Sequence, residues 1–249
     1  MDDMSINTVD SYQKENEEIK KMNFLQRLIG IIVSPAETMK NLVHKPRILF
    51  PIILIALGLV LFYIIRFPLY VETIKPSIEL ALEKAGMQLT PEQLDQQVNI
   101  SAIAGLVAIP FGALIGWIVW SSIIFGVIKI FKGKGSYKQV LSVTGYSYAV
   151  TILYLILLAI ISFATNTLAV DVPITSAATL LSADSKGTFL YGFLTGVEVF
   201  AIWKLVVAGI GLKLVSKLSS KKIFTILIVL YVLGLLITGL SQSVASMVS

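Results

Sequence analysis

The chain contains no cysteine and a single histidine, and both shortages limit its chemistry. Without cysteine it has no disulfide framework, no thiol nucleophile and no thiolate metal site. His44, the one histidine, has no ligand partner near it in the sequence, and we expect it to be a surface residue. We therefore predict no metal site and no bound cofactor.

Charged residues are also scarce. They make up 14% of the 249 residues, whereas 56% are hydrophobic, and the mean hydropathy is +0.84. This composition is typical of a membrane protein rather than a soluble domain. The predicted fold class is an all-α, polytopic membrane bundle of five helices.

The predicted spans follow from the length of the uncharged stretches, because a helix needs about 20 apolar residues to cross a bilayer. They cover approximately residues 48–66, 100–128, 139–168, 188–211 and 223–245. An extracytoplasmic helical loop is expected over 70–99, where Thr90, Pro91 and Gln93 form a helix-start pattern. Its acidic residues are expected to lie on the solvent-exposed face of a short amphipathic helix. Since no catalytic constellation lies near either surface, we predict that the protein is not an enzyme.

The region before the first span mixes acids with bases and has no apolar core followed by a cleavage site, so it is not read as a signal peptide. Residues 1–23 are predicted to be a polar cytoplasmic tail. Residues 24–46 are predicted to form an amphipathic helix in the membrane interface and a second short helix, started by Ser34 as cap, Pro35 and Glu37. The membrane domain then occupies 47–248.

Lysine and arginine are distributed unevenly between the two sides of the predicted spans. Sixteen fall on one side and four on the other, namely Arg66, Lys75, Lys84 and Lys186. Because positive loops stay on the cytoplasmic side, we predict a cytoplasmic N-terminus and an extracytoplasmic C-terminus in the cell membrane.

Eight of the cytoplasmic lysines form a predicted basic rim: Lys129, Lys132, Lys134, Lys138, Lys213, Lys217, Lys221 and Lys222. Membrane topology alone accounts for them. The alternative is that they bind anionic lipid headgroups, at about 1 kcal/mol per residue near the surface. Nucleic acid is not expected as a partner, because there is no basic soluble domain to hold it.

Two rows of small residues are predicted to let helices approach closely. They are Ala104, Ala108, Gly112 and Gly116 in the second span, and Gly192 and Gly196 in the fourth. Packing within one chain and association with itself or another membrane protein explain these rows equally well.

Glu198 falls near the middle of the apolar stretch 188–212. An unpaired charge there costs several kcal/mol, so the carboxyl must be paired, protonated or in contact with water. Tyr146, Tyr148, Ser147 and Tyr191 are candidate hydroxyl donors. Lys204 lies on another side of the helix and is expected to extend to the cytoplasmic edge. Three roles stay open for Glu198: a lock between spans, a proton or cation relay, and a site for a partner's transmembrane helix.

Two segments resemble a known family. SPAETMKNLVHKPRILFPIIL (34–54) and GKGSYKQVLSVTGYSYA (133–149) are similar to the Yip (Ypt-interacting protein) superfamily, particularly its short bacterial members, over roughly residues 24–245. The most specific element is the Gly-Tyr-Ser centred on Tyr146, where Gly145 allows close packing and the tyrosine ring is expected to be buried. The resemblance implies five helices and a cytoplasmic N-terminus.

Eukaryotic members of that family bind prenylated Rab GTPases, but this chain lacks their Asp-Leu-Tyr-Gly-Pro motif and has Val150 where a proline is common. For bacterial members the resemblance implies work beside ABC-type exporters or in envelope stress protection. We predict a non-catalytic membrane scaffold or accessory subunit. The alternatives are a transporter or ion-conducting protein that uses Glu198, and a trafficking factor that binds a small GTPase.

Overall fold

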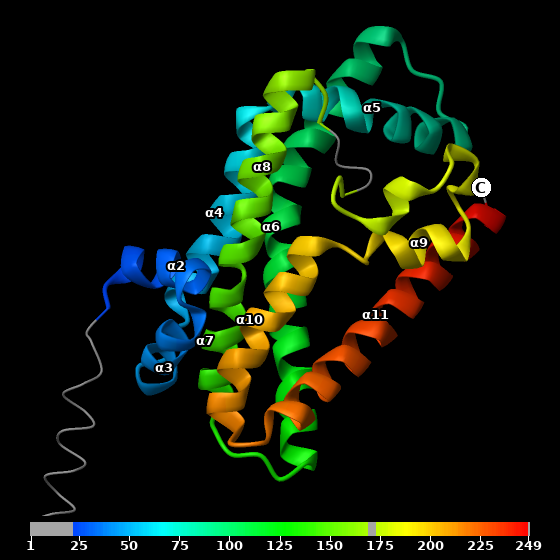
Figure 1. The fold of residues 1–249 in the computed structure, drawn as a ribbon. Helices are drawn as coiled ribbons and strands as arrows, with labels where there is room; N and C mark the ends of the chain where they lie inside the picture. Colours follow the sequence, from blue (N-terminus) through cyan, green and yellow to red (C-terminus); the bar gives the residue numbers. More distant parts are fainter. Residues whose placement is uncertain (1–21, 169–172, 249) are drawn as a thin grey trace, which may run out of the picture.

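The structure is a computed structural model that describes residues 22–168 and 173–248 (Figure 1). It confirms the all-α fold class. Within the described residues the backbone is helical or irregular, and the sole strand-like feature is an isolated bridge between Ser176 and Glu198.

The helices follow one another closely along the chain. In order they are α2 (Phe24–Val33), α3 (Pro35–His44), α4 (Leu49–Ile65), α5 (Phe67–Lys84), α6 (Pro91–Ile130), α7 (Tyr137–Ser147), α8 (Ala149–Thr165), the short 3-10 helices η1 (Ala177–Leu180) and η2 (Ala183–Ser185), α9 (Phe189–Thr195), α10 (Val199–Ser216) and α11 (Ser220–Val248).

Four apolar helical segments are long enough to cross a membrane: α6, α7 continued by α8, α10 and α11. A fifth is obtained if α4 and α5, which meet at an angle of 88°, are counted as one span. The 17 residues of α4 alone extend about 26 Å. Multiple membrane-spanning helices are therefore confirmed, and the predicted number of five is the upper count.

Helix starts agree with the predictions at one site and differ at another. Thr90 and Gln93 form the predicted reciprocal cap at the start of α6, which continues without a break for 40 residues into the second span. Ser34 precedes α3, with Pro35 in the first turn as predicted, but its side chain makes no capping hydrogen bond. Instead the Ser34 carbonyl accepts hydrogen bonds from the backbone amide and hydroxyl of Thr38. Ser34 is also the C-cap of α2, and its backbone amide donates to the Gly30 carbonyl.

The largest difference concerns the predicted fourth span, 188–211. Its helix is interrupted between α9 and α10, and Glu198 caps the second piece rather than lying inside one helix. Here α9 lies against the C-terminal part of α11, which leans away from the bundle in Figure 1. Hydropathy alone predicted a continuous span because the residues around the break are apolar.

The main core is shared by α3, α6, α7, α8, α10 and α11, and α7 is buried over most of its length. Every residue from Val140 to Ser147 is buried. At the other end of the bundle, Arg66 joins α4 to α8, since its guanidinium donates to the Ser162 hydroxyl at 3.0 Å, the Ser162 carbonyl at 3.1 Å and the Asn166 side chain at 2.9 Å. These contacts tie the end of α4 to the end of α8.

Candidate functional site

The polar residues at the start of α7 hold the connector between α3 and α4. Ser136 and Gln139 form a reciprocal cap, and the Gln139 amide also donates to the Val43 carbonyl at 2.9 Å. The Ser142 hydroxyl accepts from the amide of Arg47 and donates to its carbonyl, both at 3.2 Å. The motif that resembles the Yip superfamily therefore joins the N-terminal helices to the membrane bundle.

Gly145 and Tyr146 lie at the tightest point of this contact. A Cβ atom on Gly145 would collide with Pro51 of α4 and would approach Cζ2 of Trp117 to 2.8 Å. The Tyr146 side chain is 1% exposed, and its ring packs on Phe50 with centroids 4.8 Å apart. A residue larger than glycine at 145 would push α7 away from both helices.

Thr144 is the centre of a buried hydrogen-bond network between α6 and α7. Its hydroxyl accepts from Trp117 Nε1 at 3.0 Å, lies 2.7 Å from the Ser121 hydroxyl, and donates to the Val140 carbonyl at 2.9 Å. Buried polar groups that are bonded in this way specify how two helices pack. This network is a structural feature of the helix interface.

Glu198 is buried at the N-terminus of α10, with 8% of its surface exposed. Its carboxylate accepts the backbone amides of Phe200 at 2.9 Å and Ala201 at 2.7 Å, and a hydrogen bond from the Thr175 hydroxyl. A carboxylate at a helix N-terminus is stabilised by these amides and by the helix dipole. The donors are thus backbone amides and Thr175 rather than the tyrosine and serine hydroxyls suggested by the sequence.

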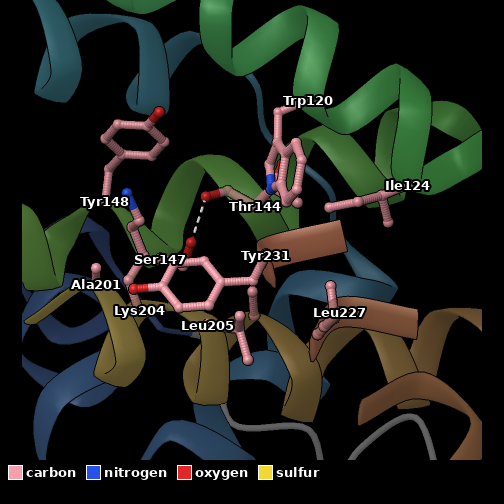
Figure 2. Close-up of a pocket in the computed structure, with 11 residues that line it drawn as sticks. Trp120, Ile124, Thr144, Ser147, Tyr148, Ala201, Lys204, Leu205, Leu227 and Tyr231 are labelled. Carbon is pink, nitrogen blue, oxygen red and sulfur yellow. Dashed lines mark hydrogen bonds between the residues drawn. The ribbon is translucent and has the colours of Figure 1, made fainter. Parts of the chain in front are cut away.

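A cavity of about 280 Å³ lies between α6, α10, α11 and the junction of α7 with α8 (Figure 2). Ser147 and Tyr148, two of the predicted polar residues, line it together with Lys204, Trp120 and Tyr231. The Ser147 hydroxyl donates to the Thr144 carbonyl, and the Tyr231 hydroxyl donates to the Gly196 carbonyl. Most of the remaining wall is apolar.

Lys204 points into this cavity, and its Nζ lies 4.6 Å from the centroid of the Tyr148 ring. Within the described part of the chain, no carboxylate lies within 4.0 Å of it. The expectation that Lys204 extends to the cytoplasmic edge is wrong, because it lies six residues into α10 and contacts Tyr148 instead.

The eight lysines of the predicted basic rim lie on two neighbouring segments. The loop after α6 contacts the end of α10, because the Lys134 amide donates to the Ser216 carbonyl at 2.7 Å and Gly135 packs on Val215. All eight side chains are exposed: Lys129, Lys132, Lys134, Lys138, Lys213, Lys217, Lys221 and Lys222. The structure therefore brings these charges to one end of the bundle.

The two predicted rows of small residues have different surroundings. Gly192 and Gly196 bring α9 close to α11, where Gly192 faces Gly239 and Gly196 faces Leu235. In α6, by contrast, Ala104, Ala108, Gly112 and Gly116 are exposed, and a Cβ added at either glycine would meet no atom within 4 Å. We call this row the α6 outer face.

The family model for the Yip1 domain matches residues 29–241, which include the second half of α2, all of α3 and α7, and both Glu198 and Lys204. The chain belongs to the Yip1 domain family. This confirms the family suggested by the sequence motifs, and the Yip1 domain of this chain is a multi-pass membrane domain.

The chain is similar in sequence to a bacterial and an archaeal protein. It is 24% identical over 221 residues to "Membrane protein YknW" of Bacillus subtilis (strain 168), covering 88% of this chain and 92% of the relative. It is also 31% identical over 61 residues to "Uncharacterized protein MJ0794" of Methanocaldococcus jannaschii, covering 24% of this chain and 43% of the relative. No solved structure matches significantly.

Sequence reasoning missed the cavity and the role of Thr175. Thr175 lies 23 residues before Glu198 and meets it only because the chain folds back there. Lys204 gave a usable signal, since a lysine well inside an apolar stretch is costly unless it faces a partner or a cavity.

Proposed function

We propose that this Yip1 domain protein is a non-catalytic scaffold or accessory subunit of a membrane complex, in the setting of ABC-type export or envelope stress protection. Its location is the cell membrane, with the N-terminus in the cytoplasm and the C-terminus outside. The observation that carries the proposal is the bonding of Glu198. Both carboxylate oxygens are used to start α10, so the carboxyl has an architectural role.

The same bonding argues against the transporter alternative. A relay group must exchange protons or cations with water, whereas Glu198 is 8% exposed and accepts hydrogen bonds from two amides and a hydroxyl. Removing these bonds during each transport cycle would leave a buried carboxylate unpaired, which is costly. A fixed role in the fold is the better account.

The partners in this proposal are the bilayer and another membrane protein. The basic rim supports contact with anionic headgroups on the cytoplasmic side, because its eight lysines are exposed at one end. The α6 outer face supports close approach of a second helix, since small residues let backbones pack in lipid. A second copy of this chain is the alternative occupant of that face.

Gentle-detergent copurification from the native membrane followed by mass spectrometry tests this proposal. We expect the unmodified protein and Glu198→Gln to bring down the same membrane complex in equal amounts. Gly112→Leu, on the α6 outer face, should recover less of it. Gly234→Leu is the matched control, because it is another glycine with open space around it but lies in α11.

Recovery of lipid and of this chain alone would contradict the accessory-subunit proposal. A small GTPase as the recovered partner would support the trafficking alternative. Flux through liposomes that contain this protein alone, lost in Glu198→Gln, would support transport.

A further inference from the structure

The Lys204 side chain lies in the wall of the cavity between α6, α10 and α11 (Figure 2). Its contact there is the face of the Tyr148 ring, 4.6 Å from Nζ. A ring face attracts a cation electrostatically, but it does not provide the oxygen or nitrogen acceptor that an ammonium N–H normally bonds to. An ammonium group has three donors, and no hydrogen bond from Nζ to another described residue accompanies this ring contact.

Three other polar side chains of the wall are already bonded to the protein. The hydroxyls of Ser147 and Tyr231 donate to backbone carbonyls, and Thr144 belongs to the network with Trp117 and Ser121. Among the residues that line the cavity, Lys204 is the charged one. A ligand that complements it must bring a negative charge.

Glu198 does not supply that charge by direct contact. It lies six residues earlier in the chain, and its two oxygens accept the amides of Phe200 and Ala201 and the hydroxyl of Thr175. No ion pair joins it to Lys204 within 4.0 Å in the described residues. The carboxylate is committed to the start of α10, and the ammonium is left for another anion.

The remaining wall is suited to an alkyl chain. Leu205, Leu227, Ile124 and Ala208 line the cavity beside the Trp120 ring. Its volume of about 280 Å³ is nearly twice that of a cavity of about 150 Å³ that binds one benzene molecule. A ligand portion of about a dozen heavy atoms is the corresponding size, on the same comparison.

We propose that this cavity binds a single-chain anionic amphiphile, whose carboxylate or phosphate pairs with Lys204 and whose alkyl chain packs on Trp120, Leu205 and Leu227. Such a ligand supplies both the missing negative charge and the apolar surface. A fatty acid and a single-chain alkyl phosphate share this chemistry. This site is separate from the α6 outer face and does not depend on the proposed function.

Native mass spectrometry of the full chain in nonionic detergent tests the site by counting bound ligands. The probes are decanoate, decyl phosphate and decyltrimethylammonium, which share one chain length and differ in head group. We expect one decanoate or decyl phosphate per chain, and no saturable binding of decyltrimethylammonium. The tighter of the two anions identifies the head group.

Four variants locate the ligand. Lys204→Met should weaken anion binding at least tenfold, whereas Lys204→Arg, which keeps the charge, should bind within about threefold of the unmodified protein. Ala201→Phe keeps Lys204 but fills the cavity, and should also weaken binding at least tenfold. Lys84→Met removes an exposed lysine of α5, outside the basic rim and the cavity, and should bind normally.

Equal anion binding by Lys204→Met and the unmodified protein would overturn the proposal. So would binding of decyltrimethylammonium with the same affinity as decanoate, because that pattern indicates partition into micelles. If Lys204→Met does not fold, Ala201→Phe decides, since undiminished binding in that variant rules out the cavity. Loss of complex copurification in any of these variants is a separate measurement and bears on the proposed function alone.

Discussion

Two regions of the bundle use similar residue types in opposite ways. In the packed region, formed by α7 and the Glu198 cap, Gly145 contacts Pro51 and Trp117, and the carboxylate accepts three hydrogen bonds. In the open region, formed by the α6 outer face and the cavity wall, Gly112 meets no neighbour, and Lys204 contacts only a ring face among the described residues. A small or charged residue in a span therefore supports the fold where its neighbours pack on it or bond to it. Where such neighbours are missing, it is free to contact a ligand or a partner.

The difference also explains how the chain divides its polar residues. In lipid, polar groups that are bonded to the protein strengthen helix association. Polar groups without such bonds raise the free energy of the protein in the membrane, and a ligand or partner that bonds to them removes this penalty. The packed region is thus expected to control stability, and the open region to control binding.

The largest effect is expected for Gly145→Leu in the packed region. The added side chain must displace Pro51 and Trp117, and overpacking of this kind costs about 1–3 kcal/mol. At roughly 2–4 °C per kcal/mol, the midpoint of thermal unfolding should fall by about 2–12 °C. Tryptophan fluorescence during heating in nonionic detergent measures this, and an unchanged midpoint would break the comparison.

Glu198→Ala is expected to have the next largest effect, because the start of α10 loses its capping side chain. Loss of an N-cap costs about 1–2 kcal/mol. Glu198→Gln should cost less, since its amide oxygen still accepts one backbone hydrogen bond. The same heating experiment ranks the two variants, and an equal loss in Glu198→Gln would show that the negative charge matters more than the capping oxygen.

Gly112→Leu and Lys204→Met test whether residues of the open region contribute little to stability. Each should change the free energy of unfolding by less than about 0.5 kcal/mol in the absence of partner or ligand, as is usual for substitutions away from packed features. The midpoint of thermal unfolding is again the measurement. A fall as large as that of Gly145→Leu would place these residues in the packed region.

The smallest effect is expected for the surface ion pair between Lys75 of α5 and Asp95 of α6, whose Nζ and Oδ1 are 2.6 Å apart. The hydrogen bond and charge of Asp95 raise the pKa of Lys75. The pair therefore contributes at pH values below the ordinary lysine pKa of about 10.4, and its contribution is lost as the pH rises through the raised value. Asp95→Asn should leave the unfolding midpoint at pH 7 unchanged, because both side chains are exposed.

The sequence predicted the parts of this fold that depend on hydropathy and local signals. The spans, the Thr90 cap, the burial of Tyr146 and the family all follow from patterns within short segments. The break before α10 does not, because it depends on Thr175 and on the contact of α9 with α11, which are tertiary. For the same reason, the row of small residues in α6 could not be distinguished from the row in α9 before the fold was known.

The sequence identified several residues of the site, but it did not identify the residues that each of them contacts. Glu198, Ser147 and Tyr148 were singled out as intramembrane polar groups, but the sequence joined them to one another. The structure separates them, with Glu198 at the cap of α10 and the other two in the cavity with Lys204. Spacing along a helix shows which residues share a face, but it does not show which helix faces them.

The central claim is that Glu198 builds the start of α10 rather than carrying protons or cations. The most direct test is proton and cation flux in liposomes that contain only this protein, measured with ion-sensitive dyes for the unmodified chain and for Glu198→Gln. We predict that both give the flux of empty liposomes. A flux carried by the unmodified chain and abolished by Glu198→Gln, with the unfolding midpoint of that variant preserved, would contradict the claim.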